Sequence, residues 1–262
     1  MNKKAAVEAF REYSALYDTD DIKIKLKIDH TYRVSDIASR IGMSVGADPD
    51  FSWFLGLLHD IGRFEQLTQY GTFKDADSVD HAELGADILF KDGLIESFPH
   101  PSLHGTAIED VGRIDETAIR LHNKLTLPDG LDEKTLLYCR ILRDADKCDI
   151  FRVLTEPPYD ERNEKIVTDS AEGVVEAARE DVMTCVTEHR CVPRKSDFTQ
   201  FEALISQCCM GFELVYSESR KIVGEQGYLE QLMNLPVESA AMRDQLETLR
   251  AEMRLAWNDS II

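Results

Sequence analysis

The chain has 262 residues, of which 43% are hydrophobic and 30% charged, which is typical of a globular protein with a substantial core. Its 49 acidic and 30 basic residues give a formal net charge of −19, which opposes non-specific binding to nucleic acid and to anionic membranes. No apolar run approaches the length of a membrane span, and the N-terminus lacks the apolar core of a signal peptide. The six cysteines form no CxxC pair, which indicates reduced thiols, so we expect a cytoplasmic protein.

Most segments carry helical periodicity and strands are scarce, so the sequence predicts an all-α fold. Residues 3–17 are expected to form a first amphipathic helix. Residues 22–28 alternate apolar residues with lysine, which taken alone favours a strand. From His30 onward the period is helical, and we interpret 22–42 as one helix. His30 lies four residues before Val34 and therefore shares its inward face.

The third predicted helix, 49–62, ends with His59 and Asp60 side by side, and Gly62 is interpreted as its stop. A polar loop is expected over 64–77. An acid at the end of a buried stripe is costly unless something cationic meets it. Because a histidine is its neighbour, a metal ion is the economical explanation.

Two further helices place a histidine on an apolar face. Asp80 is predicted to cap the first of them, on which His81 lies beside apolar residues. The second is a short helix over 115–124 that carries His122 on the same face as its alanine and isoleucine residues. Both histidines are candidate metal ligands.

The long helix predicted over 132–154 places Asp144 on an otherwise core-facing stripe. After residue 156 chemically distinctive residues become rare. We therefore expect a metal-binding helical core at 1–156 and a helical extension packed on it at 157–262. Within that extension helices are predicted over 168–189, 198–225 and 237–257.

Histidine or aspartate thus recurs on the apolar face of separate helices, in the set His30, His59, Asp60, His81, His122 and Asp144. One such residue would normally be satisfied by a polar neighbour. Several together would need many separate partners, whereas one or two metal ions satisfy them at once.

Three segments carry a resemblance to a known family. HTYRVSDIA, LLHDIGRF and LRDADKCDIF resemble, in this order, motifs of the HD superfamily of metal-dependent phosphohydrolases, over roughly residues 25–155. The resemblance implies an HD-domain helical bundle with a central metal site and, here, additional C-terminal helices. Carried over residue by residue, it implies that one metal takes His30, His59, Asp60 and Asp144.

DHAELGADIL and AIRLHNK resemble the additional histidine motifs of binuclear HD proteins. They imply a second metal held by His81 and His122, with Asp60 bridging. His104 competes with His122 for this role. We prefer His122 because it lies on a predicted helix face, whereas His104 lies in a loop that contains proline and glycine.

The donor set of imidazoles and carboxylates suits several divalent metals. Iron or manganese is favoured because mixed histidine and carboxylate pairs in this superfamily often hold them, and zinc, nickel, cobalt or magnesium are alternatives. The resemblance implies hydrolysis of a small phosphate ester or nucleotide by a metal-activated hydroxide.

Cations near these motifs are candidates for binding the phosphate. Arg63 follows the doublet where many relatives carry a cation, and it is a candidate catalytic and phosphate-binding residue beside the bridging Asp60. The alternative is a solvated cation at a helix end. Lys124 and Lys147 are further candidates for substrate binding, with surface charge as their alternative role.

Two other functions remain open. One is a di-iron oxygenase, since some HD-fold proteins use an iron pair to activate oxygen. The other is a non-catalytic binding protein on an HD scaffold, which would be expected to lack ligands that this chain retains. The segment LHNKLTLPDG lacks the paired histidine and the Gly-Tyr-Pro signature of the HD-GYP cyclic-dinucleotide phosphodiesterases, so a cyclic dinucleotide is disfavoured as substrate.

Overall fold

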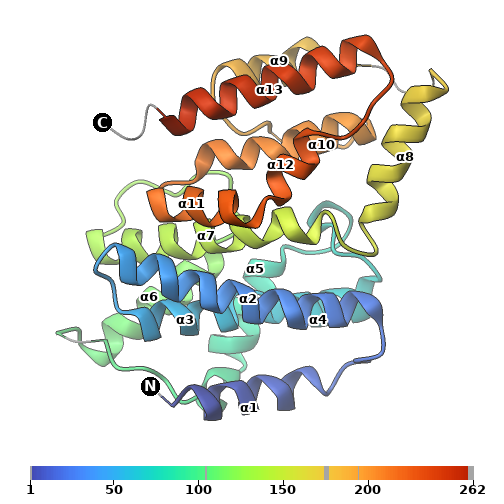
Figure 1. Ribbon diagram of the computed structural model, residues 1–262. Coiled ribbons are helices and arrows are strands. Elements are labelled where there is room, and N and C mark those ends of the chain that lie inside the picture. Colours follow the sequence, from blue (N-terminus) through green and yellow to red (C-terminus); the bar gives the residue numbers. More distant parts are fainter. Residues whose placement is uncertain (1, 104, 174–176, 194, 259–262) are drawn as a thin grey trace. The chain divides into compact units, whose positions relative to one another are not determined.

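The computed structural model describes residues 2–103, 105–173, 177–193 and 195–258, and every regular element among them is a helix (Figure 1). The all-α prediction is confirmed. The chain divides into two compact units, Met1–Asp146 and Lys147–Ile262. This division falls inside one long helix. The sequence instead predicts a domain boundary near residue 156, and that boundary stays a prediction. Over the described ranges, no helix has the length and apolar character needed to cross a membrane.

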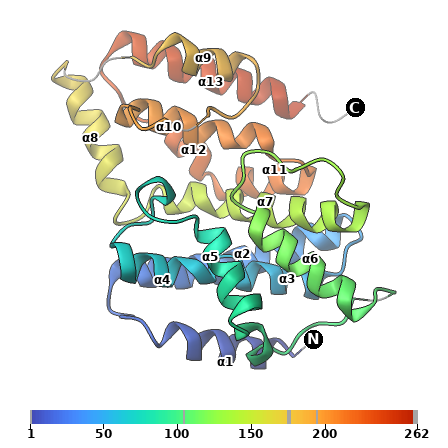
Figure 2. The ribbon, with the colours of Figure 1, turned by 180° about the vertical axis from the view of Figure 1, so that it is seen from behind.

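The first unit begins with α1 (Lys3–Ser14) and the long α2 (Ile22–Ser44). The remaining elements up to the division are α3 (Pro49–Leu58), α4 (Ile61–Tyr70), η1 (Asp75–Asp77), α5 (His81–Ala86), the π-helical η2 (Asp87–Lys91), η3 (Leu94–Ser97), α6 (Ile108–Leu121) and the first part of α7 (Glu133–Val153). Figure 2 shows α4, α5 and α6 of this unit from behind.

The second unit contains the end of α7 and the later helices. These are α8 (Asp160–Ala171), α9 (Glu180–Thr187), α10 (Gln200–Cys208), η4 (Cys209–Glu213), α11 (Ser217–Gln226), α12 (Tyr228–Met233) and α13 (Ala240–Asn258). The single helix predicted over 168–189 is wrong, because α8 ends just before Gly173, whose φ of 70° is left-handed. The six cysteines are free thiols.

The alternating segment at the start of α2 is helical. Asp21 caps the helix, its carboxylate accepting a hydrogen bond from the Lys23 amide at 2.7 Å. Tertiary packing then overrides the local strand pattern, since Ile24 and Leu26 are both buried. The interpretation of this region as one helix is confirmed, and it places Lys27 one turn before His30.

The core of the first unit is formed by large side chains of α1, α3 and α4. It includes Phe10, Phe54, Leu57, Leu58, Ile61 and Phe64, all fully buried. Phe64 lies edge-on to Phe10 and Tyr13, with ring centroids 5.9 and 5.8 Å apart. This packing fixes α3 and α4 on either side of the His59–Asp60 doublet.

The expected helix over 49–62 is in fact two helices, and the doublet lies at the break between them. Asp60 stands at the N-terminus of α4 and makes no capping hydrogen bond with its side chain, which leaves its carboxylate to other partners. Gly62 does not stop a helix but lies in the first turn of α4. A Cβ there would stand 2.2 Å from the carbonyl oxygen of His81, so glycine is required by the close approach of α4 and α5.

Candidate metal centre

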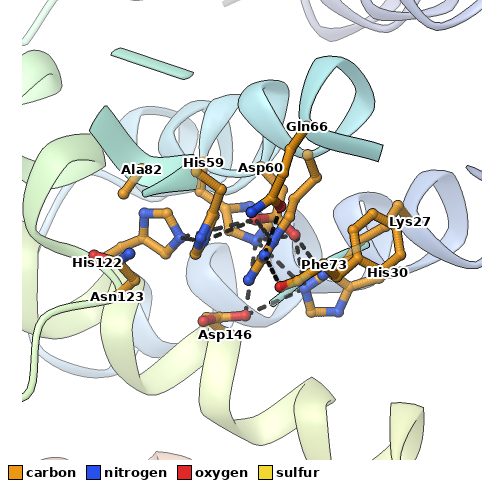
Figure 3. Close-up of polar contacts among 12 residues, drawn as sticks. Lys27, His30, His59, Asp60, Gln66, Phe73, Ala82, His122, Asn123 and Asp146 are labelled. Carbon is orange, nitrogen blue, oxygen red and sulfur yellow. Dashed lines mark hydrogen bonds and ion pairs between the residues drawn. The ribbon is translucent and has the colours of Figure 1, made fainter. Parts of the chain in front are cut away.

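The first pair of histidines joins α2 to the doublet. His30 and His59 are fully buried, and their Nε2 atoms lie 3.3 Å apart. His30 faces inward because it continues the apolar stripe of α2 that includes Val34. Both Nε2 atoms lie near the same carboxylate oxygen, Asp60 Oδ2, at 3.6 Å from His30 and 3.5 Å from His59 (Figure 3).

The second pair comes from α5 and the end of α6. His81 is the first residue of α5, which Asp80 caps through its carboxylate, as predicted. His122 follows the last residue of α6. The Nε2 atoms of His81 and His122 lie 3.0 Å apart, and they lie 3.5 and 3.8 Å from the other oxygen of Asp60, Oδ1.

Asp60 therefore stands between two histidine pairs and offers one oxygen to each. Two groups of potential ligand atoms, each within 4.8 Å of one another, meet at this residue: His30, His59 and Asp60 in one, and Asp60, His81 and His122 in the other. All these residues are buried. A carboxylate in this position has one oxygen within reach of each histidine pair.

The hydrogen bonds of the imidazoles fix which nitrogen carries the proton. Nδ1 of His59 donates to the Gly56 carbonyl and Nδ1 of His122 to the Ile119 carbonyl, each at 2.7 Å. Nδ1 of His81 donates to the Asp75 carboxylate at 2.8 Å. In a neutral imidazole the proton is then on Nδ1, so each Nε2 presents a lone pair.

These lone pairs converge on one another. When both imidazoles are neutral, the lone pairs of His81 and His122 face each other across 3.0 Å, an arrangement that is repulsive unless a cation lies against both. Imidazole nitrogens and carboxylate oxygens are ligands of divalent transition metals. The donor set thus fits divalent metal ions.

Burial and charge hold these groups in the protonation states that bind metal. Burial lowers the pKa of His59 to about 4 and that of His81 to about 3, so both imidazoles are neutral near pH 7. Burial alone would raise the pKa of the Asp60 carboxyl, but the cations Lys27 and Arg63 hold it well below its usual range. Asp60 is therefore an anion.

The carboxylate that approaches the first pair from α7 is that of Asp146. Its Oδ1 lies 3.2 Å from His30 Nε2 and 3.7 Å from His59 Nε2 (Figure 3). The expectation that Asp144 fills this place is corrected. Two residues on a helix lie about 200° apart around its axis, so Asp144 and Asp146 leave α7 in nearly opposite directions. Asp144 is itself fully buried.

Two cations flank Asp60. Lys27, which sequence reasoning missed, places its Nζ 2.7 Å from Asp60 Oδ2 and is 12% exposed. Arg63, which was expected to bind phosphate, has Nε 3.6 Å from Asp60 Oδ1. Its Nη1 donates to the Phe73 carbonyl at 2.6 Å and to Asp75 at 3.0 Å. Arg63 thus holds the segment after α4 against the cluster.

Asp75 links His81 to the surrounding protein and was not predicted. Besides His81 and Arg63, its carboxylate accepts hydrogen bonds from the side-chain amides of Gln66 and Asn123, at 2.9 and 3.2 Å. A carboxylate behind a ligating histidine fixes the orientation of the ring and raises its basicity. Asp75 lies in η1, where no helical periodicity marks it.

The two lysines that were expected to bind substrate are ion-paired with carboxylates. Lys124 is ion-paired with Asp80 and Glu83. Lys147 belongs to the second unit, where it pairs with Glu213 at 2.9 Å, and its expected role in substrate binding stays a prediction. His104, the competitor of His122, lies outside the described residues.

Residues 28–150 match the family described as HD domain. The matched range contains both histidine pairs, Asp60 and Asp146. No curated protein and no solved structure matched the chain.

Proposed function

Because the chain belongs to the HD-domain superfamily through residues 28–150, we propose that it is a metal-dependent phosphohydrolase that cleaves a small phosphate ester or nucleotide. One observation carries the proposal: the two oxygens of Asp60 are divided between two pairs of buried histidines. This arrangement supports a bridged pair of divalent ions, for which iron or manganese is our first expectation.

The residues that would hold the ions follow from the contacts. His30, His59, Asp60 Oδ2 and Asp146 would hold one ion, and His81, His122 and Asp60 Oδ1 the other. When bound, such ions lower the pKa of water and offset negative charge on a phosphate ester. Asp75 and the carbonyls of Gly56 and Ile119 keep the ligand imidazoles in the tautomer that presents Nε2.

Elemental analysis and a phosphate-release screen test the proposal together. The protein is purified, stripped with a chelator and reloaded with one metal at a time, and free phosphate is measured on a panel of monoesters, diesters and nucleotides. We expect bound transition metal and metal-dependent phosphate release without oxygen. Activity that survives exhaustive chelation would contradict the proposal, and turnover that needs both iron and oxygen would favour the oxygenase.

The substrate is proposed to be small and to reach the protein from aqueous solution. The net charge of −19 opposes polyanions such as nucleic acid, while a bound cation dominates the field a small phosphate experiences locally. Binding to duplex DNA at physiological salt with an affinity near that of the small substrate would contradict this part of the proposal.

A further inference from the structure

The cations of the first unit near the cluster differ in how they are held. Arg63 Nη1 donates to Gln66, to the Phe73 carbonyl and to Asp75. Lys124 is paired with two carboxylates, those of Asp80 and Glu83. The Nη1 atom of Arg63 and the ammonium of Lys124 are therefore held by groups other than the metal-binding side chains, while Arg63 Nε lies 3.6 Å from Asp60 Oδ1.

Lys27 is held differently. Its ammonium donates to Asp60 Oδ2, the oxygen that faces His30 and His59, and it lies 5.6 Å from the centre of the Phe73 ring (Figure 3). The side chain is 12% exposed, so it reaches the cluster from an edge that water touches. Lys27 is thus paired with a carboxylate oxygen that a metal ion would also use.

A metal ion and the Lys27 ammonium cannot both bind Asp60 Oδ2 as strongly as either would alone. A divalent ion bonds to carboxylate oxygen at about 2.0–2.2 Å, which puts it close to an ammonium that donates to the same atom. The two positive charges repel, and the flexible four-carbon stem of lysine lets the ammonium move. A phosphate group on the metal would then be a nearby anion for the ammonium to bind.

We propose that Lys27 exchanges partners when the centre is loaded: its ammonium neutralises Asp60 without metal and binds a phosphate oxygen of the substrate once metal takes Asp60 Oδ2. This inference rests on the proposed function and names the residue that recognises the phosphate. It assigns to Lys27 the role that the sequence suggested for Arg63.

Two titrations with opposite expected signs test the exchange. Lys27→Met is compared with the wild type and with Lys25→Met, which removes an equal charge from an exposed position of the same helix. Calorimetry measures Mn²⁺ binding to the stripped protein and inorganic phosphate binding to the Mn²⁺-loaded protein. For Lys27→Met we expect Mn²⁺ affinity to rise about tenfold and phosphate affinity to fall about tenfold, as for loss of one charge-assisted hydrogen bond.

A merely structural role would not produce this pair of changes. Weaker Mn²⁺ binding in Lys27→Met would mean that the lysine positions Asp60, and unchanged phosphate affinity would mean that it does not recognise phosphate, so either result overturns the inference. Should Lys27→Met fail to fold by circular dichroism, Lys27→Gln provides the same test. A wild type that binds Mn²⁺ and phosphate while Lys27→Met behaves like Lys25→Met refutes the exchange alone, whereas a wild type that binds no metal refutes the proposed function.

Discussion

Gly62 and Gly85 meet where α4 crosses α5, and a Cβ on Gly62 would lie 2.5 Å from the amide nitrogen of Gly85. The same Cβ would lie 2.2 Å from the carbonyl oxygen of His81. Because Gly62 is two residues after Asp60 and His81 begins α5, this crossing sets the distance between a carboxylate and an imidazole of the candidate centre. The lack of a side chain at Gly62 therefore allows α5 to approach closely enough for the second histidine pair to lie beside Asp60.

Gly62→Ala should separate the two helices. The added methyl meets backbone atoms, which cannot rotate away, so we expect a loss of about 2–3 kcal/mol of unfolding free energy and weaker metal binding. Urea unfolding and calorimetric metal titration measure the two effects. Gly112→Ala is the matched control, because Gly112 lies within α6 and a methyl there would enter open space, so this variant should be neutral or slightly stabilising. Equal behaviour of the two variants would show that the crossing tolerates a side chain.

Asp146→Asn should lose metal while Asp144→Asn keeps it. The Asp146 carboxylate lies 3.2 Å from His30 Nε2, and an amide is a much weaker ligand than a carboxylate. Asp144 is fully buried, so its variant is expected to be less stable, but the folded fraction should bind metal normally. Elemental analysis of the folded, monodisperse variants measures their metal content. Metal lost from Asp144→Asn and retained by Asp146→Asn would identify Asp144 as the ligand.

Asp75→Asn should weaken metal binding without removing any metal ligand. The amide cannot accept from His81, Arg63 and Gln66 as the carboxylate does, so the His81 ring loses its fixed orientation. Loss of such a partner costs about 10–100-fold in metal affinity. Asp77→Asn is the control, since Asp77 lies in the same short helix but is 61% exposed and pairs with the exposed Lys74. Metal affinities of the two variants that agree within error would exclude the orienting role.

The metal-free protein should lose stability as the pH falls below 6.5. Burial lowers the pKa of His59 to about 4 from its usual 6.5, so unfolding takes up a proton between these values. The contribution of His59 to the free energy of unfolding is fully present above pH 6.5 and is lost as the pH falls toward 4. The loss is about 2 kcal/mol at pH 5. Urea midpoints at pH 7 and pH 5 measure the loss. A His59→Gln variant should show a smaller difference between the two pH values, and an identical difference would exclude His59 as its source.

Much of the candidate centre could be predicted because its histidines lie on helices with one apolar face. His30 continues the stripe of α2, and His122 follows the inward-facing Ile119 and Ala118 of α6. A polar residue on such a face is visible in the sequence alone. The family resemblance then supplied their pairing.

Asp146 could not be chosen in this way because α7 is buried on nearly all sides. Asp144, Ala145, Cys148 and Asp149 are each fully buried, so no polar face of the helix distinguishes one aspartate from the other. Asp75 lies in a short 3₁₀ turn without periodicity. Lys27 owes its role to a partner 33 residues away.

The break between α3 and α4 has a tertiary cause as well. No proline separates His59 from Ile61, and the glycine that follows serves the crossing with α5 rather than the end of a helix. Local pattern therefore predicted that residues 49–62 are helical but not that the chain turns within them.

The division of the Asp60 oxygens between two histidine pairs has a practical consequence. Positions that share one carboxylate cannot fill independently, because an ion on one oxygen withdraws electron density from the other. Loading of the proposed pair should then proceed in two unequal steps. Protein handled in dilute buffer would retain the tighter ion and lose its partner, and specific activity would vary from batch to batch until the weaker ion is restored.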